Sequence, residues 1–343
     1  VRKRQSRGEA DGRLIGLGIS IFSEQTAHGT TADGKRRALY EQAFARLTPD
    51  GRLEVRAGIQ SIGQGLETTL AQVAADCLGL DPVDVQVRLG DTELSPYSSG
   101  AWGSRGMVWA GGATARACKE LAHRVAQIGA ALLQTDASAV TLRDGSVFGP
   151  RGSVSLRDIA RAFYLAPADL PGDTDSHGLE VTQGYAPDRL TGLHTGSAHA
   201  VVLALDPQTG GVEILDYVVV EDAGVLVNPM IVDGQIHGGT AQGIGSALYE
   251  EMPFDAQGQP LASTLADYLL PGCPEVPNIR VLHMETPSPY TEFGQKGVGE
   301  GGAIGPAAAI ANAINDALAS RGVELCELPM TPRRILAALR GAS

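Results

Sequence analysis

The sequence predicts an α+β protein, a mixed α/β chain folded into two lobes. Its 343 residues suffice for about two domains of ~150 residues each. Segments with strand character alternate along the chain with segments of helical periodicity. A faint internal echo, Gly63-Gln-Gly65 before one predicted helix and Ala241-Gln-Gly243 inside another, suggests that the two lobes are related.

The domain organisation is expected to follow three stretches of the chain. We predict a first lobe over 1–135, an irregular connecting region over 136–195 and a second lobe over 196–343. The connecting region shows only short elements: a hairpin within 140–148, a helix within 155–163 and a polar loop around 169–177. It is therefore the best candidate for a linker or lid between the lobes.

The first lobe is predicted to contain strands and two helices. Apolar runs bounded by turn residues predict strands over 14–23, 45–48, 53–56 and 83–89. Apolar residues at helical spacing predict helices over 66–80 and 112–134. A loop rich in glycine, serine and proline, 90–105, lies between the last strand and the second helix.

The second lobe shows the same alternation. Strands are predicted over 199–204, 211–220 and 278–284, and helices over 234–250, 305–319 and 331–339. The last helix opens with Thr331 as its N-cap and proline at its first position, both typical of helix starts.

Charge and composition exclude several classes of protein. The chain has 27 Lys and Arg against 39 Asp and Glu, and its net charge of −12 disfavours a general nucleic-acid binder. No apolar run approaches the ~20 residues of a membrane span, and the basic start leads into polar sequence rather than a signal-peptide core. We expect a cytoplasmic protein, although a partner could carry an export signal for a whole complex.

The spacing of cysteine and histidine disfavours a metal site built from side chains. The four cysteines, at 77, 118, 273 and 326, form no C-x-x-C pair. The seven histidines include no H-x-x-x-H or H-E-x-x-H motif. Scattered thiols of this kind are expected to be buried small hydrophobes in a reducing compartment.

Glycine is the most unusual feature of the composition, with 44 of 343 residues, and it clusters in four segments where backbone must approach something closely. The first segment, 58–68, feeds a helix N-terminus that favours a phosphate or carbonyl ligand, unless it is only a tight turn. The second joins Gly90-Asp-Thr92 to 100–106, and its hydroxyls, Arg105 and indole suit an anion and a flat wall. A solvated loop with Arg105 paired to a carboxylate is an equal alternative.

The third segment, 222–245, places four glycines inside a helical pattern, which costs about 1 kcal/mol each relative to alanine. A close neighbour is therefore expected. Helix packing is the plain explanation, whereas the amides of Gln235 and Gln242 favour a ligand. His237 by itself is expected to be a hydrogen-bonded structural residue.

The fourth segment, 293–306, sets Glu300 among glycines just before a long apolar helix. With little side-chain bulk around it, this carboxylate can be held against a substrate. The alternative is that Glu300 only caps the following helix, where an acidic residue is stabilising.

Five motifs, in order, resemble the molybdenum-binding subunit of the xanthine dehydrogenase/aldehyde oxidase family of molybdenum hydroxylases. They are Gly63-Gln-Gly-Leu-Glu-Thr68; Gly90-Asp-Thr92 with Gly103-Ser-Arg105; Asp222-Ala-Gly with Asn228-Pro229; Gly234-Gln-Ile-His-Gly-Gly239 with Ala241-Gln-Gly243; and Lys296-Gly-Val-Gly-Glu-Gly-Gly302. The resemblance implies that family's molybdopterin-binding fold, two lobes of mixed sheet with packed helices. It covers only the C-terminal half of a subunit about twice as long.

The resemblance also implies the cofactor and its site. Molybdenum is held by the dithiolene of molybdopterin rather than by protein side chains, and we expect the cytosine dinucleotide form. Glu300 matches the catalytic base. The implied cofactor-binding residues are Gly63, Gln64, Gly65, Thr68, Thr92, Gly103, Ser104, Arg105, Gln235, Gly238, Gln242 and Gly299.

The implied reaction is hydroxylation of an electron-poor carbon with water as oxygen donor, Glu300 acting as base. Electrons leave through 2Fe-2S centres and FAD, which this cysteine pattern does not house. We therefore expect an iron–sulfur small subunit, an FAD medium subunit and the N-terminal half of the molybdenum subunit as separate chains. A split gene is favoured because the basic start leads directly into the first strand.

Two other functions compete with this interpretation. One is a catalytically inert half that binds or stores the cofactor, against which the intact Glu300 argues. The other is a nucleotide-binding oxidoreductase, since Gly297 to Gly302 fits G-x-G-x-x-G, but no clear strand precedes it.

The substrate is not indicated by the sequence. A purine, an N-heteroaromatic compound and an aldehyde all suit the chemistry. Trp102 and Tyr290 are possible walls of a substrate pocket, although either is as easily an ordinary core residue.

Overall fold

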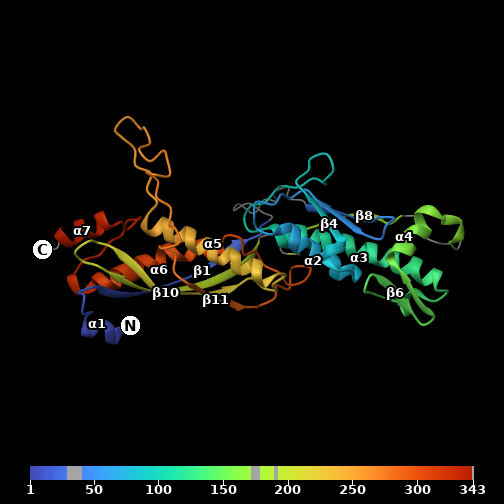
Figure 1. Ribbon diagram of the computed structural model, residues 1–343, viewed down its shortest axis with the longest axis horizontal. Coiled ribbons are helices and arrows are strands. Elements are labelled where there is room, and N and C mark those ends of the chain that lie inside the picture. Colours follow the sequence, from blue (N-terminus) through green and yellow to red (C-terminus); the bar gives the residue numbers. More distant parts are fainter. Residues whose placement is uncertain (29–40, 171–177, 189–191, 342–343) are drawn as a thin grey trace.

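The computed structural model describes residues 1–28, 41–170, 178–188 and 192–341. Two lobes lie side by side along the long axis of the molecule (Figure 1). We name each lobe by one strand of its main sheet. The β2 lobe contains a four-stranded sheet in the order β4 (Val85–Leu89), β3 (Leu53–Ala57), β2 (Glu41–Leu47) and β8 (Glu180–Tyr185). The β1 lobe contains a second sheet in the order β1 (Leu14–Thr26), β9 (Leu193–Leu205), β10 (Val212–Asp222) and β11 (Ile279–Met284).

The β2 lobe packs two helices on a mixed sheet. Its strands are β2 (Glu41–Leu47), β3 (Leu53–Ala57), β4 (Val85–Leu89) and β8 (Glu180–Tyr185), with β3 and β4 parallel and the other pairs antiparallel. Helices α2 (Leu66–Leu78) and α3 (Gly106–Leu132) cover it. Leu47, Val55 and Leu121 are among the fully buried residues of this core.

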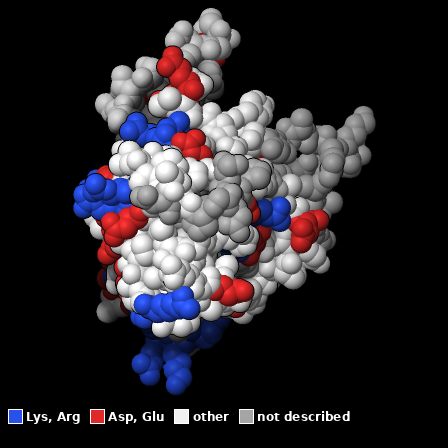
Figure 2. Space-filling view, turned by 90° about the vertical axis from the view of Figure 1, so that its right-hand side faces the viewer, with Lys and Arg blue, Asp and Glu red and all other residues white. Residues whose placement is uncertain are grey.

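A small sheet extends the far end of this lobe. It consists of β5 (Thr141–Arg143), β6 (Ser146–Gly149) and β7 (Gly152–Ser155), followed by α4 (Leu156–Leu165). Ser155 caps α4, because its hydroxyl accepts a hydrogen bond of 3.0 Å from Asp158 N. Figure 2 shows this end of the molecule, where basic and acidic side chains are scattered among uncharged ones over the described surface.

The β1 lobe is built on long strands. β1 (Leu14–Thr26) pairs antiparallel with β9 (Leu193–Leu205), β9 pairs antiparallel with β10 (Val212–Asp222), and β10 is parallel to β11 (Ile279–Met284). Helices α5 (Pro229–Leu248) and α6 (Gly301–Leu318) pack on this sheet and on each other, and α1 (Arg2–Arg7) and α7 (Pro332–Gly341) lie at its outer end (Figure 1).

Glycines set the distance between these elements. A Cβ at Gly16 or Gly18 of β1 would collide with carbonyl oxygens of α6, so this helix lies directly on the strand. A Cβ at Gly239 of α5 would be 2.8 Å from Ala303 N, and one at Gly243 would be 2.6 Å from Pro306 Cγ. Helix packing is therefore the reason for these two glycines, one of the two explanations open from the sequence.

The predicted elements are confirmed, and the main differences are at helix starts. The helices predicted from 112, 234 and 305 begin at Gly106, Pro229 and Gly301. Glycine and proline near these starts favoured loops in the sequence analysis. In α5, however, Asn228 is the N-cap and proline occupies the first helical position, where it is tolerated. Pro306 lies inside α6 and cannot donate to Gly302 O, which instead accepts from Thr240 Oγ1 at 3.4 Å.

The sheets combine segments from both sides of the divisions proposed at 135 and 195. β1 lies near the start of the chain, before every element of the β2 lobe, but it pairs with β9 of the second half. β8, from the predicted connecting region, pairs with β2. Such pairings join distant segments and leave no local pattern in the sequence. The polar loop predicted at 169–177 lies outside the described residues from 171 onwards.

The expectation of four buried thiols is wrong for two of them. Cys118 is buried and Cys77 partly so, whereas Cys273 and Cys326 are exposed. Both exposed thiols lie in non-helical segments on the surface, where nothing packs over them. Among the described helices, none combines the length and the apolar character needed to cross a bilayer.

Candidate functional site

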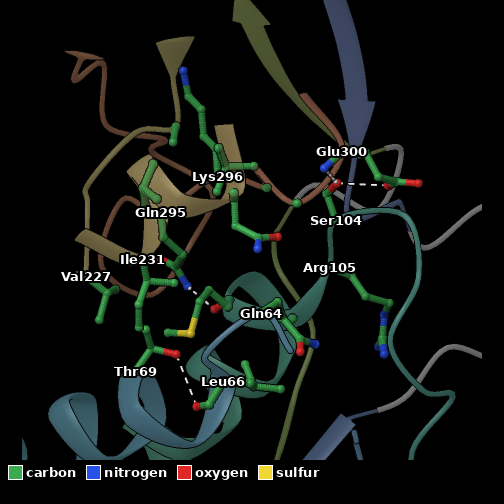
Figure 3. Close-up of a pocket in the computed structure, with 18 of the residues that line it drawn as sticks. Gln64, Leu66, Thr69, Ser104, Arg105, Val227, Ile231, Gln295, Lys296 and Glu300 are labelled. Carbon is green, nitrogen blue, oxygen red and sulfur yellow. Dashed lines mark hydrogen bonds between the residues drawn. The ribbon is translucent and has the colours of Figure 1, made fainter. Parts of the chain in front are cut away.

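A pocket of about 300 Å³ lies between the two lobes. The β2 lobe contributes the loop before α2 and the loop before α3, and the β1 lobe contributes segments 223–235 and 295–300. These are parts of the four glycine-rich segments of the sequence. The prediction that these segments surround a common ligand is therefore supported by their convergence (Figure 3).

The starts of four helices meet at this pocket. Its lining includes Leu66 of α2, Gly106 of α3, Ile231 of α5 and Glu300, the N-cap residue of α6. The first turn of a helix leaves backbone N–H groups without helical partners and carries partial positive charge. Four such turns around one space favour a ligand that carries phosphate or other anionic groups.

Glu300 lies at one end of the pocket and is held by Ser104. Ser104 Oγ donates to Glu300 Oε2 over 2.9 Å and accepts a hydrogen bond of 3.0 Å from Glu300 N (Figure 3). Glu300 is the N-cap of α6, but its side chain makes no capping hydrogen bond. The carboxylate therefore contacts the other lobe instead of capping its own helix.

Glycine permits this contact between the lobes. A Cβ at Gly297 would collide with the carbonyl oxygen of Ser104, and one at Gly299 would lie 3.5 Å from its hydroxyl. Only residues without side-chain bulk let the two loops approach so closely at Gly297. The loop is fixed from behind by Gln295, a buried amide that donates to Met107 O over 3.1 Å.

The opposite end of the pocket is apolar. Ile62, Leu66, Met107, Ile231 and the run Val225-Leu-Val227 line it. Gly65, which has a left-handed backbone with φ 72°, would place a Cβ 2.7 Å from Ile231 Cδ1. The absence of a side chain at Gly65 therefore allows the start of α2 to pack against α5, and this contact closes the apolar end of the pocket.

Asn228 ties the two lobes together beside this end. Its Oδ1 accepts a hydrogen bond of 3.1 Å from Ile231 N, and its Nδ2 donates to Gln72 Oε1 on α2 over 3.0 Å. One side chain thus caps α5 and joins it to the β2 lobe. This double contact is a structural explanation for Asn228-Pro229, which belongs to the third of the five motifs.

Arg105 uses its guanidinium for structure. Its Nη1 lies 2.9 Å from Glu41 Oε2, with both side chains fully buried, and also donates to Gly100 O over 2.7 Å. Burial raises the pKa of Glu41, and the positive charge of Arg105 limits the rise. The side chain points away from Gln64 and Ile231 (Figure 3). Arg105 therefore pairs with a carboxylate, as the alternative explanation of the second segment predicted, but the pair is buried rather than solvated.

Eight of the predicted site residues line the pocket. They are Gln64, Trp102, Gly103, Ser104, Arg105, Gln235, Gly299 and Glu300. Seven others lie outside its lining: Gly63, Gly65, Thr68, Thr92, Gly238, Gln242 and Tyr290. Of these seven, all but Gly65 are exposed in this chain.

Some lining residues carried no role in the sequence analysis. Thr69 lines the pocket in place of Thr68, since it shares the helix face of Leu66. Its hydroxyl donates to Leu66 O over 3.1 Å. Helical phase could have identified it. Gln295 lies within the fourth glycine-rich segment but belongs to none of the five motifs, and no local sequence pattern distinguishes it.

His237 is structural, as expected. Its Nδ1 lies 2.7 Å from Asp233 O and its Nε2 lies 3.0 Å from Ile279 O. Within the described part of the chain, no group of three or more His, Cys, Asp or Glu side chains is arranged to hold a metal ion. The residues preceding Gly297 form loop structure and not a strand, so the dinucleotide-fingerprint context remains missing.

Known proteins resemble this chain over almost its whole length. Residues 1–277 match the family model of the molybdopterin cofactor-binding domain. The chain is 38% identical to the nicotine 6-hydroxylase large subunit of Paenarthrobacter nicotinovorans, covering 99% of this chain and 42% of that protein. It is 34% identical to the carbon monoxide dehydrogenase large chain of Hydrogenophaga pseudoflava, covering 95% of this chain and 41% of that one.

A solved structure shows the same fold. Quinoline 2-oxidoreductase from Pseudomonas putida 86 superposes with a TM-score of 0.91 and 39% identity, covering 99% of this chain and 43% of that one. The predicted fold class is confirmed. This chain spans about two fifths of the length of the relatives it matches.

Proposed function

This chain belongs to the molybdopterin cofactor-binding family of the molybdenum hydroxylases, and we propose that it forms the part of such an enzyme that presents the catalytic base, Glu300. The observation that carries the proposal is the convergence of four helix N-termini and Glu300 on one pocket between the lobes. An assembly protein with an inert cofactor cradle would have no use for a carboxylate held in this way.

The pocket fits the cofactor by its chemistry. Helix N-termini offer backbone N–H groups to the phosphates, and the amides of Gln64 and Gln235 offer donors and acceptors to the pterin. The apolar end accommodates a flat ring system. We propose the cytosine dinucleotide form, for which acid hydrolysis of the purified enzyme should release one CMP per molybdenum.

The cofactor, when bound, supplies a molybdenum centre that takes two electrons from a substrate carbon while water provides the oxygen atom. Glu300 removes a proton in that reaction. Because Ser104 occupies Oε2, Oε1 is the oxygen left to accept the proton. The same hydrogen bonds fix the carboxylate before the substrate arrives, which lowers the cost of orienting it.

The partners and location are further parts of the proposal. The chain spans about two fifths of its relatives, so we propose that the rest of the large subunit covers the open side of the pocket. We propose 2Fe-2S and FAD subunits as the electron carriers, and a cytoplasmic location that cell fractionation would test. The names of two relatives, a nicotine hydroxylase and a quinoline oxidoreductase, favour an N-heteroaromatic substrate over a purine or an aldehyde.

The test is metal analysis and kinetics of the assembled enzyme. We expect about one molybdenum per chain. Glu300→Gln should leave the molybdenum content unchanged and lower turnover by at least ~10²-fold, because general base catalysis is lost. The exposed Glu324→Gln serves as a matched control and should retain activity. A molybdenum content near zero would contradict the proposed function, and retained activity of Glu300→Gln would remove Glu300 as the base.

A further inference from the structure

Three carboxylates gather beneath the first turn of α6. Glu24 on β1 and Glu221 on β10 lie on the two strands that flank β9. Thr195 of β9 is paired with Glu24 in the sheet, and its hydroxyl lies 3.3 Å from Glu221 Oε1. The end of β1 that carries Glu24 lies beside the loops that hold Glu300, because a Cβ at Gly297 would lie 2.6 Å from Thr26 Cβ and Ala27 N donates to Gly103 O over 2.9 Å. We call Glu24, Glu221 and Glu300 the carboxylate cluster.

Glycines in α6 hold the helix against this cluster. A Cβ at Gly301 would lie 2.8 Å from Glu221 Oε1, and one at Gly305 would collide with the ring of His199. On β1, Ser20 Oγ donates to Gly305 O over 2.7 Å. Because larger residues would push α6 away, the glycines keep Glu300, at its N-cap, near Glu24 and Glu221.

The cluster retains unused hydrogen-bonding capacity in the interior. Glu221 is fully buried, and among the described residues no partner reaches its Oε2. Oε2 of Glu24 is likewise buried and without a partner in the described part of the chain. A buried ionised oxygen without a donor is costly, whereas a protonated carboxyl is tolerated.

Other titratable side chains around the cluster have partners of their own. Lys296 Nζ lies 2.8 Å from Asp222 Oδ2, and His283 Nε2 lies 2.7 Å from Asp233 Oδ1. His199, whose Nδ1 lies 3.2 Å from Tyr217 Oη, has its pKa lowered to about 4 by burial, so it is neutral. Burial raises the pKa of Glu24 and of Glu221 to about 7. For Glu24 the negative charges of Glu300 and Glu221 add to the rise, whereas for Glu221 the hydroxyl groups of Ser197 and Thr195 limit it.

We propose that Glu24 accepts the proton that Glu300 collects during turnover and passes it to solvent, and that the buried Glu221 sets the proton affinity of Glu24. The step breaks one O–H bond on the Glu300 carboxylic acid and forms one on the Glu24 carboxylate. No electrons leave either group. Glu24 then gives the proton to water or to a buffer base, and both carboxylates are ready for the next cycle.

This inference rests on the proposed function, because it assigns an exit for the proton of that reaction. When the rest of the subunit and a substrate cover Glu300, direct exchange with bulk water is blocked. Glu24 is only half-buried, lies on β1 and is not among the residues that line the pocket. It therefore offers a route out that does not pass through the bound substrate.

The test compares Glu24→Gln, Glu24→Asp and Glu221→Gln in the assembled enzyme, with molybdenum content measured in each. Glu24→Gln should lower turnover by at least about tenfold and increase the solvent isotope effect, since proton transfer becomes limiting. Imidazole or acetate in the buffer should restore much of the rate, and Glu24→Asp should retain more activity than Glu24→Gln. Rescue of this kind does not follow from a structural role.

Infrared spectroscopy supplies a readout independent of turnover. The wild-type enzyme should show a protonated carboxyl C=O band that titrates near pH 7, and Glu24→Gln should remove part of it. In Glu221→Gln the remaining Glu24 band should titrate at lower pH, because a nearby negative charge is gone. The exposed Glu324→Gln should leave the band unchanged.

The outcomes separate this inference from the proposed function. If Glu300→Gln is inactive with molybdenum retained while Glu24→Gln keeps wild-type turnover and pH profile, the proton route through Glu24 is wrong and the function stands. Loss of rate in Glu24→Gln without rescue or a changed pH profile also overturns it, as does a wild-type enzyme without the titrating band. An assembled enzyme without molybdenum instead overturns the proposed function.

Discussion

Glu41 in the β2 lobe and Glu221 in the β1 lobe are both fully buried, but their surroundings are opposite. Glu41 accepts hydrogen bonds from Arg105 and Ser98, each over 2.9 Å, and the loop before α3 is fixed by these contacts. Glu221 meets hydroxyl groups and the glycine start of α6. The comparison shows that burial alone does not assign a role to a carboxylate, since a cationic partner favours the ionised form that burial disfavours.

This difference has a functional counterpart. The positive charge of Arg105 favours the ionised form of Glu41, against the effect of burial, and the pair stabilises one conformation of the loop. A carboxylate without a cation, whose pKa lies near neutrality, can gain and lose a proton at little cost. The first suits the walls of the pocket, and the second suits the neighbourhood of a catalytic base.

The largest expected effect is that of Glu41→Gln. The amide cannot neutralise Arg105, which would leave a buried guanidinium without its counter-charge. We expect the free energy of unfolding to fall by roughly 3–5 kcal/mol, as measured by denaturant titration at pH 7. A loss below ~1 kcal/mol would mean that the Arg105–Glu41 pair is not an essential part of the β2 lobe.

The same substitution at Glu221 should have the opposite sign. Its pKa is raised from 4.5 to about 7 by burial, so between these values the folded state binds more protons than the unfolded state. The contribution of Glu221 to the free energy of unfolding is fully present below pH 4.5 and is lost as pH rises through 7. Glu221→Gln should therefore stabilise the protein at pH 8, on the order of 2–3 kcal/mol, with little change at pH 4.

The check is a pair of stability curves from pH 4 to pH 8 for wild type and Glu221→Gln. The wild-type curve should fall between pH 4.5 and pH 7, and the variant curve should be flatter there. Equal slopes would show that Glu221 titrates normally and would erase the contrast with Glu41.

Asn228→Ala is an uncharged reference with which the stability changes of Glu41→Gln and Glu221→Gln can be compared. The substitution removes the cap of α5 and the hydrogen bond to Gln72, but no charge. We expect a loss of about 1–2 kcal/mol that does not vary with pH. A pH-dependent loss would indicate that this inter-lobe contact is coupled to the carboxylate cluster.

Local patterns of the sequence predicted most elements and the four segments that form the pocket. Periodicity located helices such as 66–80, and glycine clusters marked the places of close approach. The motif named Thr68, whereas its neighbour Thr69 lines the pocket in this chain. Neighbouring helical residues are rotated by about 100° around the axis, and a motif does not state which of them faces the pocket.

The carboxylate cluster could not be predicted in this way. Glu24 and Glu221 are nearly 200 positions apart and each is an isolated acidic residue in a strand. They meet because β1 and β10 both pair with β9 and because glycines bring α6 onto that sheet. These are properties of the assembled sheet, and neither leaves a spacing in the sequence.

A density map of the assembled enzyme tests the central claim most directly. It should contain molybdopterin in the pocket between the lobes, with phosphates at the helix starts and the Glu300 carboxylate facing the metal end. A cofactor bound elsewhere, or Glu300 turned away from it, would contradict the account.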